Sequence, residues 1–277
     1  MIKDKYSAVW VSYSSISDYL KCPRSYYLKN VYRDPKSNRK MSLMQPALAL
    51  GQIVHDTVES LSLLQIKNRK EFSLMDSFHT NWEKVSGKKG GFIDAEEENG
   101  YKLRGEAMIQ RIIDHPGPIY NKAIKIRKSL PYFWLSEEEN IILCGKIDWI
   151  EYLEETDSIH IIDFKTGKHE EDADSLQLPI YYLLAIECQS RPVSKMSYWY
   201  LGRETEPFGV DLPDGEKARR DVFEVAKRIA LARKLERFVC PKKDGCMFCR
   251  HYESILEGNA EHVGTNAYRQ DIFVLKK

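Results

Sequence analysis

Hydrophobic and polar residues along the chain recur with two periods, one near 3.6 and one near 2, and so predict both helices and strands. The predicted helices are residues 12–20, 46–64, 71–84, 96–114, 173–188 and 215–237. The predicted strands are residues 123–130, 141–153, 158–164, 195–201 and 207–212. This order predicts an α/β fold in which a mixed central sheet is flanked by helices.

The first part of the chain is predicted to be a helical arm. Ser12, Ser14 and Ser15 offer N-caps to the first helix, and the glycine-rich run at 87–91 predicts a flexible loop between later helices. We find no internal repeat or low-complexity tract. We therefore predict one domain, 1–277, made of the arm (1–118), a central core (119–237) and a C-terminal cysteine-containing tail (238–277).

Composition narrows the class without fixing the function. The 277 residues are 43% hydrophobic and 11% aromatic, which predicts a globular protein with a full core. No apolar stretch approaches the roughly 18 residues that a membrane helix needs, and the first residues lack the apolar core of a signal peptide. These features predict a cytoplasmic protein without a membrane partner. The net charge of +1 gives no overall cationic field.

The chemistry gathers around a predicted antiparallel hairpin. Residues 141–153 and 158–165 are rich in Ile, Trp, Tyr and Phe, and the polar residues 154–157 separate them as a turn. A turn centred between Glu155 and Thr156 places Asp148 opposite Asp163, with Cβ atoms about 4.5–5.5 Å apart. Lys165 lies two residues beyond Asp163, so strand alternation predicts it on the same face.

Two carboxylates and an ammonium group on one face suit phosphodiester hydrolysis. Mg²⁺ or Mn²⁺ between the acids would polarise a phosphate and acidify a bound water, while Lys165 orients that water or neutralises developing charge. The competing interpretation is a structural ion pair between Lys165 and one of the aspartates.

Two helices add side chains to this face. Gln177 and Tyr181 stand one turn apart on the predicted helix 173–188, so both can face the hairpin. His55 lies one turn after Gly51 and is a candidate third metal ligand. The alternative for His55 is a surface or capped histidine.

Together these motifs resemble the RecB-like branch of the PD-(D/E)XK nuclease superfamily, which includes CRISPR-associated RecB-like exonucleases. The resemblance covers most of the chain. The residues that carry it are His55 in Gly51-Gln-Ile-Val-His55, Asp148 in Gly145-Lys-Ile-Asp148, Asp163 and Lys165 in Ile-Asp-Phe-Lys-Thr-Gly, and Gln177 with Tyr181. The central acid is aspartate where other members carry glutamate, and both occur in the pattern.

The resemblance implies a role for each matching residue. His55, Asp148, Asp163 and the Phe164 carbonyl are expected to bind a divalent cation. Lys165 is expected to be catalytic, and Gln177 and Tyr181 to position Lys165 or the substrate phosphate.

The cysteines predict a second metal site. Cys240, Cys246 and Cys249 lie within ten residues, and Cys22 is the best fourth thiolate, with His251 a poorer alternative. Four thiolates suit either Zn²⁺ or an iron–sulfur cluster. The resemblance implies a [4Fe-4S] staple that joins the two ends of the chain. The remaining Cys144 and Cys188 are assigned to packing.

An early basic stretch interleaved with tyrosines is predicted to contact nucleic acid. Its candidate residues are Lys21, Arg24, Tyr26 and Tyr27, which would bind phosphates and stack on bases of a single strand. The second basic run, at 217–237, is interpreted as an ordinary solvated helix face.

The sequence therefore predicts a Mg²⁺- or Mn²⁺-dependent DNA nuclease, with exonuclease action on single-stranded ends implied by the resemblance. No Gly-x4-Gly-Lys-Ser/Thr loop is present, so unwinding would need a helicase partner. DNA repair or recombination, CRISPR spacer processing within an integration complex, and a phage or mobile-element role all stay open. The alternative from another class is a catalytically weak DNA-binding or scaffold subunit of such a complex.

Overall fold

The computed structural model describes residues 4–126 and 130–276. Within these residues the strands are β1 (Val9–Val11), β2 (Met41–Leu43), β3 (Tyr132–Ser136), β4 (Ile141–Cys144), β5 (Trp149–Leu153), β6 (Ser158–Lys165), β7 (Val193–Tyr200), β8 (Phe208–Val210), β9 (Ala260–Thr265) and β10 (Asp271–Leu275). The α-helices are α1 (Tyr13–Lys21), α2 (Pro23–Tyr26), α3 (Pro46–Ser60), α4 (Ile66–Arg69), α5 (Leu74–Trp82), α6 (Ala95–Asp114), α7 (Gln177–Cys188), α8 (Gly215–Lys234) and α9 (Met247–Leu256).

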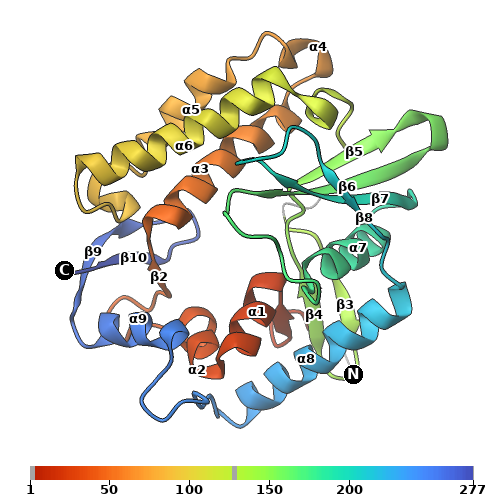
Figure 1. Cartoon of the computed structure of the whole chain (residues 1–277). Coiled ribbons are helices and arrows are strands. Elements are labelled where there is room, and N and C mark those ends of the chain that lie inside the picture. Colours follow the sequence, from red (N-terminus) through yellow and green to blue (C-terminus); the bar gives the residue numbers. More distant parts are fainter. Residues whose placement is uncertain (1–3, 127–129, 277) are drawn as a thin grey trace.

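The largest sheet has the strand order β5-β6-β7-β8 and is mixed, because β6 and β7 are parallel while the outer pairs are antiparallel. The helix α7 makes the crossover between β6 and β7 (Figure 1). Two three-stranded sheets, β1-β4-β3 and β2-β10-β9, join early strands to later ones. This arrangement confirms the predicted α/β fold class with a mixed sheet flanked by helices.

Side-chain alternation along β6 separates two hydrophobic cores. Ile161 belongs to a cluster that contains residues of α7 and α8, whereas Ile162 and Phe164 belong to a cluster with residues of α3, α5 and α6. Asp163 and Lys165 lie two and four residues after Ile161, and alternate residues of a strand point to the same face. Both therefore lie on the α7 side of the sheet. The helices α3, α5 and α6 cover the opposite face (Figure 1), whereas α1 packs on the side of α7 and α8.

The predicted strand 141–153 was wrong, because the chain changes sheets in its middle. β4 pairs with β1 and β3, and β5 pairs with β6 in the other sheet. The residues between them, 145–148, lie outside both strands. A Cβ at Gly145 would lie 2.8 Å from Leu184 Cδ1, so the close approach of α7 favours glycine at this crossing.

Two further sequence expectations need correction. The predicted strand 123–130 is reduced, among its described residues, to one bridge between Ala123 and Glu151, and residues 127–129 lie outside the described part. The predicted flexible loop at 87–91 contains a 3₁₀ turn, Gly87–Gly90, in which Gly90 is buried. The short strands β1 and β2, together with β3, β9 and β10, were missed because three to six residues carry little periodicity.

The division of the chain at 118/119 and 237/238 stays a prediction. Strand pairing crosses both of these boundaries, since β1 pairs with β4 and β2 pairs with β10. Among the described residues, every helix is too short or too polar to cross a lipid bilayer.

Candidate metal centre and catalytic residues

β5 and β6 pair in the predicted register, with Trp149 opposite Ile162 and Leu153 opposite Ser158. Asp148 immediately precedes β5, and its Oδ2 accepts a hydrogen bond of 3.0 Å from the Phe164 backbone N–H. In an antiparallel ladder the N–H and carbonyl of one residue point toward the same neighbour, so the Phe164 carbonyl also faces the Asp148 side. The hairpin therefore brings Asp148 to the end of β6 that carries Asp163.

Lys165 is held in a network of buried and half-buried polar groups. Its Nζ lies 2.9 Å from Asp163 Oδ2 and 2.9 Å from Glu171 Oε2, and it donates a hydrogen bond to Gln177 Oε1. Gln177, the first residue of α7, also donates through Nε2 to Asp163 Oδ1 (2.6 Å) and to Tyr181 Oη (3.4 Å). The structure thus places Asp163, Lys165, Gln177 and Tyr181 in one connected group.

Glu171 was not identified from the sequence, although it completes this network. It accepts hydrogen bonds from Tyr13 Oη (2.6 Å) and Ser175 Oγ (2.8 Å) in addition to its ion pair with Lys165. An acidic residue six positions after the lysine was a weak signal. The contact with Tyr13 spans 158 positions in the chain and left no local pattern to recognise.

His55, Glu59 and Asp148 form a candidate metal group, because one ligand atom from each lies within 4.8 Å of the others. His55 Nδ1 is 3.3 Å from Asp148 Oδ2 and 3.7 Å from Glu59 Oε1. Glu59 was missed, although it stands four residues after His55 on α3, a spacing that places both on one helix face. Glu59 also forms an ion pair with Lys146.

Asp163 lies beside this metal group and not within it. Its carboxylate is 1% exposed and turns toward Lys165 and Gln177. Oδ2 is buried, and its partner is the Lys165 ammonium, whose Nζ lies 2.9 Å away. An imidazole, carboxylates and a nearby carbonyl are a donor set that fits a hard divalent cation such as Mn²⁺ or Mg²⁺.

The electrostatics of the site favour a cation. Burial raises the pKa of the Asp163 carboxyl to about 7, and the Asp148 carboxylate adds to this rise while Lys165 opposes it. Burial acts to lower the pKa of Lys165, but the Asp163 and Glu171 carboxylates outweigh it and raise that pKa. Burial also acts to lower the pKa of His55, but the Asp148 and Glu59 carboxylates outweigh it and raise that pKa to about 10. Carboxylates that are buried together disfavour one another's charge, and a bound dication relieves that penalty.

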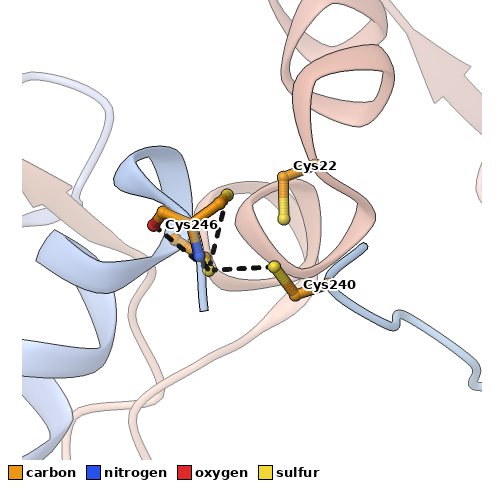
Figure 2. Close-up of side chains that lie close together, drawn as sticks. Cys22, Cys240 and Cys246 are labelled. Carbon is orange, nitrogen blue, oxygen red and sulfur yellow. Dashed lines mark hydrogen bonds between the residues drawn. The ribbon is translucent and has the colours of Figure 1, made fainter. Parts of the chain in front are cut away.

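The four predicted cysteine ligands converge at a second site. Figure 2 shows Cys22, at the N-cap of α2, pointing toward Cys240 and Cys246. The four sulfurs of Cys22, Cys240, Cys246 and Cys249 lie within 4.8 Å of one another. Cys249 Sγ is 3.7 Å from Cys240 Sγ and 3.8 Å from Cys246 Sγ. Residues about 220 positions apart in the sequence thus meet in a third hydrophobic cluster, which includes Leu28 and Tyr252.

The thiol pKa values differ within this cysteine group. Burial raises the pKa of Cys22 to about 12. Burial also acts to raise the pKa of Cys246, but backbone N–H groups at the start of α9 outweigh it and lower that pKa to about 7. The exposed His251 and the two remaining cysteines, Cys144 and Cys188, are not members of the group that the described residues form.

The predicted nucleic-acid contacts stay a prediction, except that the burial of Tyr26 contradicts its assigned role. Tyr26 is 1% exposed and packs edge-on against Tyr19, so it is not available to stack on a base. Arg24 forms two hydrogen bonds with the Glu253 carboxylate, of 2.5 and 3.1 Å. Lys21 is exposed, and its Nζ lies 5.9 Å from the centre of the Phe248 ring. This segment packs the cysteine group against α9, which explains its aromatic content.

The sheet, the paired acids and the adjacent lysine are the parts of a nuclease core. A comparison with models of known families matches the PD-(D/E)XK nuclease superfamily over residues 10–254. This chain belongs to the PD-(D/E)XK nuclease superfamily. Among curated proteins, no match to the chain was found.

Replacing Glu59 with glutamine is expected to weaken Mn²⁺ binding by about tenfold to a hundredfold, because the metal group loses one of its negative ligands. Isothermal titration with Mn²⁺ measures this affinity. Asp56→Asn is the matched control, since Asp56 precedes Glu59 by one helical turn but contributes no atom to the metal group. Equal Mn²⁺ affinity in the Glu59→Gln and unmodified chains would remove Glu59 from the site.

Proposed function

We propose that this chain is a metal-dependent deoxyribonuclease that degrades single-stranded DNA from its ends. The observation that carries the proposal is the hydrogen-bonded set of Lys165, Asp163 and Gln177 beside the His55, Glu59 and Asp148 group. The preference for ends and for single strands rests on the resemblance to RecB-like exonucleases.

In the proposed mechanism His55, Glu59 and Asp148 hold Mg²⁺ or Mn²⁺, with Asp163 and the Phe164 carbonyl beside them. The bound ion would supply Lewis-acid polarisation of the phosphate and a water of lowered pKa. Lys165 keeps its proton, because Asp163 and Glu171 each lie 2.9 Å from its Nζ. Its ammonium group orients the attacking water or neutralises charge that develops on the phosphate.

Gln177 and Tyr181 are positioning residues in this scheme. Gln177 accepts from Lys165 and donates to Asp163, so one side chain fixes the relative position of the lysine and the acid. Tyr181 is 7% exposed, and its hydroxyl lies within hydrogen-bond distance of the same amide. A locked amide limits the rotamers of Lys165 before substrate arrives.

We also propose that the cysteine group holds a structural metal that joins α2 to the start of α9. The resemblance favours a [4Fe-4S] cluster, which four thiolates ligate. The separations of 3.7 and 3.8 Å favour one Zn²⁺ ion, since a tetrahedral site with bonds of about 2.3 Å has sulfurs about 3.8 Å apart. Four irons per chain with absorbance near 400 nm would establish the cluster, and one zinc per colourless chain would establish Zn²⁺. A reducing compartment such as the cytoplasm would keep these thiols available.

Degradation of an oligonucleotide labelled at either end tests the proposed activity. We expect cleavage with Mn²⁺ or Mg²⁺, no cleavage with a chelator, and faster loss of a single strand than of the matched duplex. Mononucleotides or short products from one labelled end would identify an exonuclease and its polarity. Cleavage of a circular single strand would instead identify an endonuclease. A helicase or a CRISPR integration complex is the proposed kind of partner, because the resemblance is to nucleases of those two settings.

A further inference from the structure

A cleft of about 710 Å³ opens directly beside the candidate metal group. Glu59 and Asp148 form part of its wall, and the rest comes from the ends of α3 and α5, from residues 123–126 and from the start of β5. We propose that this cleft, named here the Lys84–Lys125 cleft, binds the single strand that leads into the active site. The inference rests on the proposed function and assigns that site its substrate-binding groove.

The cations of the cleft differ in whether a carboxylate already neutralises them. Lys146 is paired with Glu59. Lys84 Nζ, in contrast, donates to the neutral Asn81 Oδ1 at 2.6 Å and lies near the Asp56 carboxylate without forming an ion pair with it. Lys125 forms no ion pair with any residue of the described chain, and both lysine side chains are exposed at the cleft. Cations that have no direct ion pair and lie next to a phosphodiester-cleaving centre are suited to bind backbone phosphates.

Several basic residues on other surfaces are paired with carboxylates. Arg24 pairs with Glu253, Lys29 with Asp18 and Arg39 with Asp271. On α8, Lys217 pairs with Asp221 and Arg219 with Glu187. The early basic stretch and α8 therefore offer less free positive charge than their sequences imply.

The cleft also carries an apolar wall for the bases and sugars. Leu63 is 73% exposed, and Phe72, Ile124 and Ile126 line the cleft around it. A groove that binds single strands combines phosphate-binding cations with apolar or aromatic surfaces that contact bases, without reading sequence. Asp56 also lines the wall, one helical turn before Glu59, so the cleft carries carboxylates as well as lysines.

The volume of the cleft favours a single strand. Pockets of roughly 300–1,000 Å³ enclose ligands of drug size, so this cleft accommodates about one to two nucleotides. The cleft thus gives a physical basis for the single-strand preference that the sequence resemblance implies.

Binding of fluorescein-labelled dT12, followed by anisotropy from 50 to 300 mM KCl with Ca²⁺ in place of Mn²⁺, tests the assignment. In the Lys84→Ala/Lys125→Ala variant we expect the dissociation constant at 100 mM KCl to rise roughly tenfold or more. The slope of log K against log salt should become shallower by about 1.4, since each phosphate contact on a single strand contributes about 0.7. With Mn²⁺, KM for dT12 should rise while kcat stays unchanged.

The control is Lys217→Ala, an exposed lysine of α8 whose substitution should alter neither affinity nor slope. Thermal melting checks that each variant is folded. An unchanged dissociation constant and slope in the folded double variant would overturn the cleft assignment. An unmodified chain that binds dT12 with the expected lysine dependence but cleaves nothing with Mn²⁺ would uphold the cleft and refute the proposed nuclease function.

Discussion

Replacing Lys165 with alanine is expected to lower the single-turnover rate of DNA cleavage by roughly a hundredfold to a thousandfold. The ammonium group stabilises charge that develops only in the transition state, and removing one such group costs about that factor. The loss also leaves the Asp163 and Glu171 carboxylates without the cation that lies 2.9 Å from each. The site of the variant is then more negative, which disfavours the charge that the phosphate gains in the transition state. We therefore expect kcat to fall more than the affinity for DNA.

The matched control for this substitution is Lys168→Ala. Lys168 lies three residues further along the same segment, is exposed, and contributes no side-chain contact to the Asp163, Gln177 and Tyr181 group. Quenched-flow cleavage of an end-labelled strand, with enzyme in excess, measures both variants. A folded Lys165→Ala chain that cleaves at the unmodified rate would show that this lysine is a structural ion-pair partner, the competing interpretation of its spacing.

Replacing Cys249 with serine is expected to release the bound metal and to lower the melting temperature by about 10 °C. Cys249 is 1% exposed, and its sulfur is the one from which both the 3.7 and 3.8 Å separations are measured. A structural metal contributes folding free energy directly, and a change of about 1 kcal/mol shifts the melting temperature of a chain near this size by about 2–4 °C. The effect should be largest for the contacts between α2 and α9.

Cys188→Ser provides the comparison, since Cys188 is half-buried at the end of α7 and lies outside the metal group. Its metal content should equal that of the unmodified chain, and its melting temperature should change by no more than a few degrees. Metal analysis and calorimetry on the same preparations separate loss of metal from loss of packing. Full metal content in Cys249→Ser would exclude this cysteine as a ligand.

The hairpin register could be predicted because a polar turn lies between two apolar strands. Residues 154–157 fix the centre, and Asp157, with φ of 44°, adopts the left-handed conformation that closes the turn. Strand alternation then places Asp163 and Lys165 on one face, and the register brings Asp148, which immediately precedes β5, to the same end of β6. The turn position and strand alternation were enough for this prediction, because Asp148, Asp163 and Lys165 lie within fewer than twenty residues of one another.

The parts that sequence reasoning missed depend on contacts between distant segments. Glu171 joins Lys165 only because α1 lies against the loop before α7, where Tyr13 holds the carboxylate. Tyr26 was predicted to stack on bases, but it is buried and packs edge-on against Tyr19. The strand 141–153 looked continuous because both of its halves are apolar, and the pattern does not record that β4 and β5 pair in different sheets.

The proposed nuclease function is tested most directly by cleavage of 5′-labelled single-stranded DNA, comparing the unmodified, metal-loaded chain with Lys165→Ala, each with Mn²⁺ and with a chelator. We expect the unmodified chain to release labelled products with Mn²⁺ and not with the chelator, and the variant to bind the strand but leave it intact. Cleavage that persists in the chelator, or no cleavage by a folded chain with both metal sites filled, would contradict the proposed function.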